Sequence, residues 1–161
     1  MNPDSPERED FGAELAWVYR SWRGIVDAQL RPLDMTQARW ITLLHIARGG
    51  TGLLQKDLAE RMGIEGPTLV RLLDALETAD LVTRKEAAGD RRGKTLVLTQ
   101  RAEPIVDEIQ RVVSESRQQV LDDISDEDIA TCVRVFRHVR EKIAAYDQPH
   151  EIDGRAKAGV D

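Results

Sequence analysis

Residues 55–78 carry the pattern that most constrains the fold of this chain. A short helix is expected over 55–62, and Gly63 suits the left-handed position that commonly ends a helix. A second helix follows at Pro67, which is favourable in a first helical turn. Its apolar residues form a single stripe, namely Leu69, Leu72, Leu73 and Leu76. Two short helices joined by a tight turn predict a helix-turn-helix.

A β-hairpin is predicted immediately after the second helix. Residues 81–84 and 95–99 are β-prone, and the polar, glycine-containing segment 86–93 separates them. Five basic and two acidic residues lie between Arg84 and Lys94, although the whole chain has a net charge of −6. The order of helix, turn, helix and hairpin predicts a mainly α fold with a small β-hairpin wing.

The segments on both sides of this module have the three- and four-residue spacing of apolar residues that is typical of helices. The first helix is expected over 11–30 and ends before Pro32, because the residue preceding a proline avoids the α conformation. Residues 38–47 are apolar nearly all round, which predicts a central helix. Two further helices are expected over 101–146, and Ser125 is expected to cap the second of them.

The second helix of the pair presents polar side chains opposite its leucine stripe. Thr68 and Arg71 lie near its N-terminus, the end that such helices insert into the DNA major groove. Arginine can bond to guanine O6 and N7 together, and threonine can contact a base edge or the thymine methyl group. The alternative interpretation is that Arg71 is an ordinary surface arginine.

The predicted hairpin tip, residues 90–94, is denser in cations than an ordinary turn. A narrow DNA minor groove has an enhanced negative potential that attracts arginine, so Arg91 and Arg92 are candidates for this groove. Asp90 would repel phosphate if it were free, and we expect it to pair with a neighbouring arginine and order the loop. A solvated, charged hairpin is the alternative interpretation.

Composition and motifs argue against catalysis, metal binding and membrane insertion. No phosphate-binding loop follows the glycines at 49–52, and the three histidines lack metal-ligand spacing, so we expect no enzyme activity, cofactor or metal. A single cysteine, Cys132, cannot form an internal disulfide, which favours a reducing cytoplasm. No segment reaches the ~20 apolar residues of a membrane span. We expect a cytoplasmic protein with no membrane partner.

Four segments of this sequence resemble one known family. They are LDMTQARW at 33–40, GIEGPTLVR at 63–71, DRRGK at 90–94 and LVLT at 96–99. Together they resemble the MarR family of winged helix-turn-helix transcriptional regulators, and within it the SlyA-like branch. The similarity extends over about 11–146, and the pattern from Gly63 to Arg71 followed by the Asp-Arg-Arg wing is its most specific part.

The resemblance implies a domain over 11–146 that dimerises through 11–31 and 101–146. It implies a DNA-binding lobe over 36–99, with the helix-turn-helix at about 55–78 and the wing at 81–99. Segments 1–10 and 147–161 are expected to be a flexible N-terminus and tail. A two-fold dimer is expected to bind double-stranded DNA, in association with the nucleoid, at an inverted repeat whose half-sites lie about one helical turn apart.

The resemblance also assigns DNA contacts residue by residue. Pro67, Thr68 and Arg71 match the positions that read the major groove, Arg91 and Arg92 match the wing, and Asp90 is its ordering carboxylate. Lys94 is expected to be a further DNA contact. The alternative functions are a winged-helix protein-interaction module, or a silencing antagonist with little operator specificity.

Many members of this family bind small aromatic carboxylates between the dimer helices and the DNA-binding lobe. The matching region of this chain contains aromatic residues and a cation that suit such an effector, namely Trp22, Leu30, Thr36, Arg39, Trp40 and His45. The alternative is that the two tryptophans are core residues. Cys132 is expected to be a small buried hydrophobe rather than a peroxide sensor.

Overall fold

A computed structural model describes residues 5–87 and 90–146, with the backbone alone for 90–92. The predicted flexible tail, 147–161, lies outside the described residues. The chain divides into two units, Met1–Val120 and Leu121–Asp161. The first unit contains five helices and a two-stranded hairpin among its described residues, which confirms the predicted mainly α fold with a small β wing.

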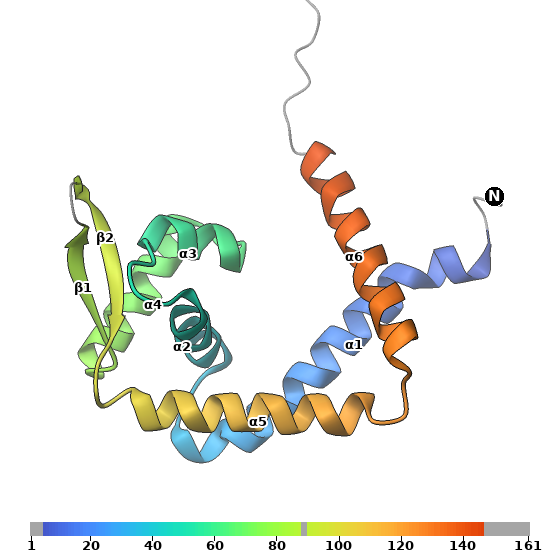
Figure 1. Ribbon diagram of the computed structural model, residues 1–161, viewed down its shortest axis with the longest axis horizontal. Helices are drawn as coiled ribbons and strands as arrows, with labels where there is room; N and C mark the ends of the chain where they lie inside the picture. The colour runs from blue at the N-terminus through green and yellow to red at the C-terminus, as the bar shows by residue number, and fades with distance from the viewer. Residues whose placement is uncertain (1–4, 88–89, 147–161) are drawn as a thin grey trace, which may run out of the picture. The chain divides into compact units, whose positions relative to one another are not determined.

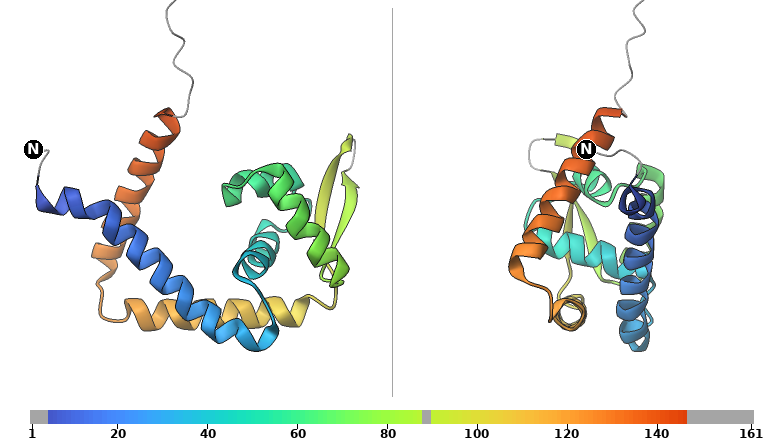
Figure 2. Two further views of the ribbon diagram at one scale, coloured as in Figure 1. Left: turned by 180° about the vertical axis from the view of Figure 1, so that it is seen from behind. Right: turned by 90° about the vertical axis from the view of Figure 1, so that its right-hand side faces the viewer.

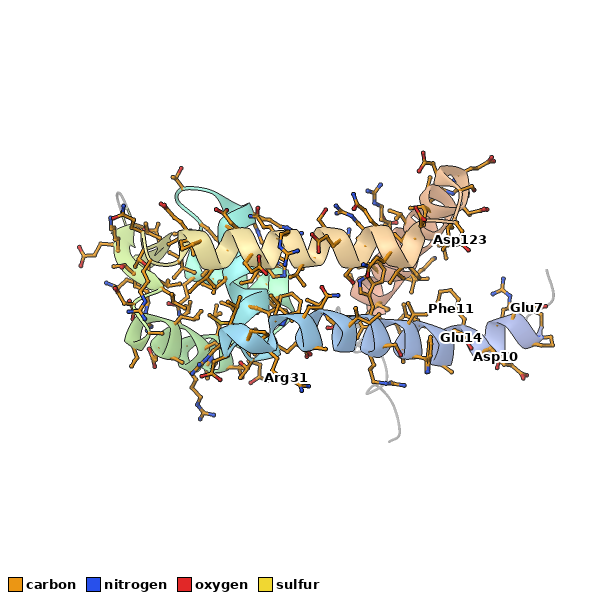
Figure 3. The ribbon with its side chains drawn as sticks, turned by 90° about the horizontal axis from the view of Figure 1, so that it is seen from below. Glu7, Asp10, Phe11, Glu14, Arg31 and Asp123 are labelled. Atoms are coloured by element: carbon orange, nitrogen blue, oxygen red, sulfur yellow. The ribbon has the colours of Figure 1, made fainter. Side chains whose placement is uncertain are left out.

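Helix α1, Pro6–Leu30, begins upstream of the predicted start at residue 11. Part of the segment 1–10 is therefore helical, and its flexibility stays a prediction. Pro6 occupies the first helical turn, and Glu7 and Glu9 interact favourably with the positive end of the helix dipole. Backbone and Ser5 hydrogen bonds hold the pKa of Glu7 below its ordinary value. Figure 3 shows Glu7 near the start of α1, in the half of the helix that carries the labelled residues Asp10 and Glu14.

Three helices form the centre of the first unit after the short 3-10 turn η1, Arg31–Leu33. They are α2, Gln37–Gly49, α3, Gln55–Met62, and α4, Gly66–Thr78. Views from two sides place α2 between the α3–α4 pair and α5, Glu103–Leu121 (Figure 1 and Figure 2). This position explains why α2 is buried on most of its surface, as its nearly continuous apolar sequence predicts.

A left-handed glycine makes the turn between α3 and α4. Gly63 has φ of 63°, and its N–H donates to the carbonyl oxygens of Ala59 and Glu60. The next N–H, from Ile64, also donates to Ala59 O, at 3.1 Å. The turn lets both helices pack on one core, in which four leucines are completely buried: Leu58, Leu69, Leu73 and Leu76.

The wing consists of the antiparallel strands β1, Val82–Ala87, and β2, Asp90–Leu98. The segment 86–93, which was expected to be a loop, is therefore mostly strand. Glu86 pairs with Lys94 across the ladder, with 3.8 Å between carboxylate oxygen and Nζ, and opposite charges at such positions favour continued pairing. The N–H of Leu96 donates to Leu53 O at 3.0 Å, which joins the wing to the turn that follows α2.

Helix α6, Asp126–Tyr146, belongs to the second unit. Ser125 caps it as expected, because its Oγ accepts a hydrogen bond from the Asp128 N–H at 3.1 Å and donates to the Asp128 carboxylate at 2.6 Å. The helix contains no buried residue in the described chain. Cys132 is exposed on it, so the expectation of a buried cysteine is wrong for the single chain.

None of the helices in the described ranges combines the length and the apolar character that crossing a membrane requires.

Candidate functional site

The face of α4 opposite its buried stripe is open to solvent. Pro67, Thr68 and Arg71 are all exposed, whereas Leu69 and Leu73 on the other side are completely buried. Pro67 and Thr68 lie in the first turn, where backbone N–H groups and the helix dipole favour an anion. The exposed face therefore presents one cation and one hydroxyl group at the N-terminal half of α4.

The wing lies beside this helix pair, and its cations belong to the strands rather than to a loop. Lys94 has 45% of its side chain exposed, with Glu86 as its ion-pair partner. The backbone of Asp90, Arg91 and Arg92 forms the start of β2. The side chains of these three residues lie outside the described part of the structure, so their predicted roles stay predictions.

A crevice of about 410 Å³ separates the helix pair from the wing. Its walls come from α3, α4, β2 and the residue before α3, namely Leu54, Gln55, Lys56, Ala59, Gly66, Leu69, Gly93 and Lys94. Lys56 and Lys94 therefore bring positive charge to one crevice from two elements. Sequence reasoning missed Lys56, although its place in the first turn of the first helix of the pair is where such helices approach the DNA backbone.

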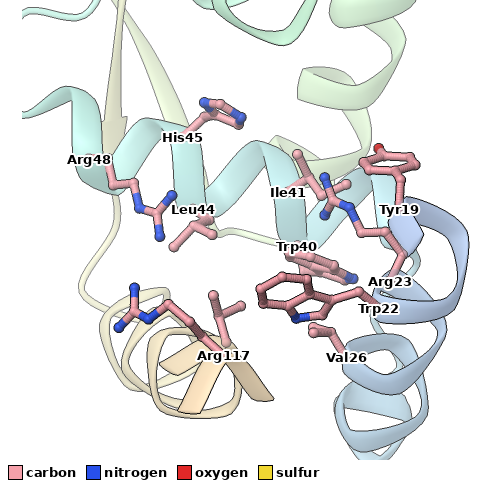
Figure 4. A pocket seen from close by; sticks show the side chains of 11 residues that line it. Tyr19, Trp22, Arg23, Val26, Trp40, Ile41, Leu44, His45, Arg48 and Arg117 are labelled. Atoms are coloured by element: carbon pink, nitrogen blue, oxygen red, sulfur yellow. The ribbon is translucent and has the colours of Figure 1, made fainter. Parts of the chain in front are cut away.

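A second cavity, of about 260 Å³, lies between α1, α2 and α5 (Figure 4). Three of the six residues predicted to bind an effector line it: Trp22, Trp40 and His45. The other three do not. Leu30 is completely buried, Thr36 is an exposed residue before α2, and Arg39 lines a different cavity together with Asp34 and Arg101.

Three arginines line this second cavity instead of Arg39. Arg23 lies over two aromatic rings, with its Cζ 5.2 Å from the centroid of Tyr19 and 4.8 Å from that of Trp40. Arg48 from α2 and Arg117 from α5 lie toward the same end of the cavity (Figure 4). Sequence reasoning missed this pair because only the packing of α5 beside α2 brings the two residues together.

His45 has a pKa below its ordinary value, mainly because burial penalises the charged imidazole. The positive charges of Arg48, Arg23 and Arg61 lower it further. Beside it, Trp40 Nε1 donates a hydrogen bond to Asp27 at 2.7 Å, which orients the indole ring against α1. The cavity therefore combines a fixed aromatic wall with an excess of positive charge.

A metal site finds no support in the described ranges, where histidine, cysteine and carboxylate side chains form no group of three or more that could hold an ion.

Comparison with known proteins identifies the family. Residues 33–93 match the MarR family model. The crystal structure of transcriptional regulator PA3341 is 40% identical to this chain, with a TM-score of 0.78, and the match covers 84% of this chain and 98% of that one.

Two further structures share the fold at lower identity. The transcriptional regulator SlyA is 20% identical with a TM-score of 0.75, over 84% of this chain and 95% of that one. A mutant MarR from E. coli complexed with operator DNA is 22% identical with a TM-score of 0.71, over 84% of this chain and 99% of that one. The SlyA-like branch stays a prediction, but the family match and the identity to PA3341 agree: the chain belongs to the MarR family of winged helix-turn-helix transcriptional regulators.

Proposed function

We propose that this regulator binds double-stranded DNA as a homodimer, at an operator that is an inverted repeat. In this proposal α4 enters the major groove with Thr68 and Arg71, and the wing reaches the adjacent minor groove with Arg91 and Arg92. The related MarR from E. coli has been crystallised with operator DNA, which supports this mode of binding. The observation that carries the proposal is the exposed polar face of α4, which lies opposite the buried leucines and beside the wing.

The proposed dimer is supported by apolar side chains that the single chain leaves open to solvent. On α1, Trp17 is 61% exposed and Val18 44% exposed. On α6, Ile143 is 56% exposed and Tyr146 83% exposed. Large apolar side chains that are exposed on a helix are typical of an interaction site, and two-fold symmetry is the commonest solution for a homo-oligomer. A two-fold dimer would present two α4 helices to two half-sites about one helical turn apart.

Selection of bound sequences from a random DNA library, followed by affinity measurements over a range of salt concentrations, tests the proposal. We expect an inverted repeat to emerge and log affinity to fall linearly with log salt concentration, because bound cations release counterions from the phosphates. An absence of sequence enrichment together with weak, salt-insensitive binding would favour the alternative, a winged-helix module for protein interaction.

Arg71→Ala tests the assignment of α4 to the major groove. We expect the affinity for the selected operator to fall by about 1–3 kcal/mol and the preference at one base pair to relax. Arg111→Ala is a matched control, because Arg111 lies on α5 and pairs with Glu108 and Glu115 at 2.6 Å. Equal operator affinities for Arg71→Ala and the control would show that Arg71 does not contact the base pairs.

We infer that the cavity between α1, α2 and α5 takes a small aromatic acid that releases the operator. Trp22, Trp40 and Leu44 offer an apolar surface for the ring, and Arg48 and Arg117 offer positive charge at one end for the carboxylate. The low pKa of His45 keeps it neutral near pH 7, so these arginines supply the positive charge. Because the cavity walls belong to both α1 and the lobe, an occupant can favour one arrangement of these helices over another.

Salicylate titrated into the protein–operator complex tests the effector. We expect millimolar salicylate to weaken operator binding by the wild type and to have a smaller effect on Arg117→Ala. Arg39→Ala is the matched control, because Arg39 lines a different cavity and its loss should leave the response unchanged. This role of the cavity would be contradicted if salicylate did not weaken operator binding by the wild type. It would also be contradicted if Arg39→Ala abolished the effect of salicylate and Arg117→Ala did not.

A further inference from the structure

Arg84 of β1 is bonded to two carboxylates of α4. Its Nε donates to Glu77 Oε2 at 2.8 Å, and its backbone N–H donates to Glu77 Oε1 at 2.9 Å. Its Nη2 lies 2.7 Å from Glu77 Oε2 and also pairs with Asp74 Oδ1. Both oxygens of Glu77 are therefore used by one residue of the wing, and the same guanidinium group reaches a second carboxylate one helical turn earlier.

The position of Arg84 makes this network more rigid than a typical surface ion pair. In the alternating pattern of β1, Arg84 follows Val82 on the face that meets α4, and its cross-strand partner Leu96 is 1% exposed. Only 19% of the Arg84 side chain is exposed. A partly buried, planar guanidinium group with several directional bonds restricts orientation far more than a solvated lysine does.

The protonation behaviour of Glu77 agrees with this geometry. The hydrogen bond from the Arg84 side chain is the largest influence, and it holds the pKa of Glu77 below its ordinary value although burial acts in the opposite direction. The pKa of Arg84 is raised, chiefly by the same hydrogen bond. Both groups therefore remain charged at neutral pH.

The network also changes how the charge of the wing is interpreted. Arg84 is one of the five basic residues between Arg84 and Lys94, yet its charge is directed to α4 and is offset there by Asp74 and Glu77. Asp74 lies three residues after Arg71, a spacing at which side chains of one helix meet. Among the described residues Arg71 forms no ion pair, and Asp74 is paired with Arg84 instead.

We propose that Arg84 is a positioning residue for DNA reading, which fixes the wing relative to α4 so that both can engage one site together. The inference rests on the proposed DNA binding and adds a residue that does not itself contact DNA. Without the Arg84 side chain, β1 would keep its ladder to β2, the wing would keep its link to Leu53, and the backbone N–H of residue 84 could still bond Glu77. The wing would lose the directional bonds of the guanidinium group to α4.

The test compares the wild type with Arg84→Met and with the triple variant R84M/D74N/E77Q, which also neutralises both carboxylates. Each protein is titrated with the selected operator, and with a version whose flanking A·T pairs are changed to G·C so that the narrow minor groove is lost. The ratio of the two affinities measures how well the wing engages. Thermal unfolding and sedimentation establish that each variant is folded and has the wild-type assembly state.

We expect Arg84→Met to bind the operator about tenfold more weakly, a loss that corresponds to the charge-assisted hydrogen bonds of one residue. We expect its affinity ratio to fall toward one. The triple variant should recover affinity for the altered site, because no unpaired carboxylate remains on α4, while its ratio stays low.

An unchanged ratio in Arg84→Met would overturn the inference, and so would a ratio restored to the wild-type value in the triple variant, because charge alone would then explain the effect. If the wild type itself shows no salt-dependent, sequence-selective binding, it is the proposed function that fails. If the wild type binds selectively but ignores the flanks, the minor-groove role of the wing fails, and the positioning role of Arg84 fails with it.

Discussion

The helix-turn-helix lobe and helix α6 differ sharply in how much of their apolar surface a single chain buries. In the lobe, Leu58, Leu69 and Leu73 are completely buried, and residues of the wing belong to the same core. Helix α6 has comparable helical spacing of apolar residues but buries none in the described chain. The lobe is therefore stabilised by its own core, whereas α6 has an apolar face that a second copy of the chain can cover. The same sequence pattern marks an internal core in one region and, in the other, a face that is open to solvent in the single chain and that the proposed dimer would cover.

Substitution of an apolar residue of α6 is the strongest way to break this comparison. Ile143→Lys places a charge in the proposed dimer interface, and we expect the protein to sediment as a monomer. A monomer can occupy only one half-site at a time, so the affinity for the inverted repeat should fall by about a hundredfold or more. Sedimentation and operator titration measure the two effects on the same sample.

Glu141→Lys is the control for that substitution, because Glu141 lies on the opposite side of the helix and its side chain is 74% exposed. It adds the same side chain in the same turn of α6 and should leave the dimer intact. A dimer that survives Ile143→Lys, or dissociates equally in the control, would show that this face of α6 is not the interface.

Truncation of a lobe leucine tests the other side of the comparison. Leu73→Ala removes a completely buried side chain, and we expect the free energy of unfolding to fall by about 2–5 kcal/mol. Leu72→Ala is the matched control, because Leu72 is only partly buried and should lose less. Chemical denaturation at one fixed protein concentration measures both, since a dimer gains stability by mass action. Equal losses would indicate that the core is not where the burial pattern places it.

Local patterns in the sequence predicted most of the fold. Gly63, Ser125 and the leucines of α4 each act through neighbours within one or two turns, so their roles could be inferred from spacing alone. The strand bounds were less predictable, because pairing of Glu86 with Lys94 extends the wing through a segment whose composition resembles a loop. Residue 6 as the start of α1 was missed because polar residues gave no apolar period there.

The sites depend more on contacts between distant segments, and sequence reasoning succeeded less well there. The exposed face of α4 follows from its own helical period, which is why Thr68 and Arg71 could be located in advance. The pairing of Arg84 with Glu77 depends on how β1 packs on α4. The cavity cation Arg117 was missed for a similar reason, since it is far in sequence from the tryptophans that it faces.

The turn that makes the helix pair possible should respond to a single methyl group. Gly63 adopts φ of 63°, so Gly63→Ala should destabilise the protein by about 1 kcal/mol through backbone strain. Gly66→Ala is the control, because Gly66 begins α4 and an added Cβ would meet no atom within 4 Å. It should be neutral or slightly stabilising. If denaturation showed Gly66→Ala to be less stable than Gly63→Ala, the result would contradict the turn geometry.

The smallest expected effect concerns pH and the contact between the wing and α4. The Arg84 hydrogen bond lowers the pKa of Glu77 in the folded protein from the ordinary 4.5, so the unfolded chain binds this proton more readily. The stabilisation is therefore complete above about pH 5 and is lost as the pH falls through the folded pKa. Because the Glu77 side chain is 34% exposed, it should amount to less than about 1 kcal/mol.

Glu77→Gln should reduce stability at pH 7 and approach the wild type near pH 3, as measured by denaturation at a series of pH values. In an Arg84→Met background the same substitution should show a smaller pH dependence, because the side-chain hydrogen bond that most lowers the pKa of Glu77 is absent and only the backbone N–H of residue 84 still donates to the carboxylate. A pH-dependent difference of undiminished size without the Arg84 side chain would mean that its guanidinium group does not set the pKa of Glu77. The side-chain link between the wing and α4 would then be weaker than its geometry indicates, and the position of the wing would depend on the apolar core and on the Leu53 hydrogen bond.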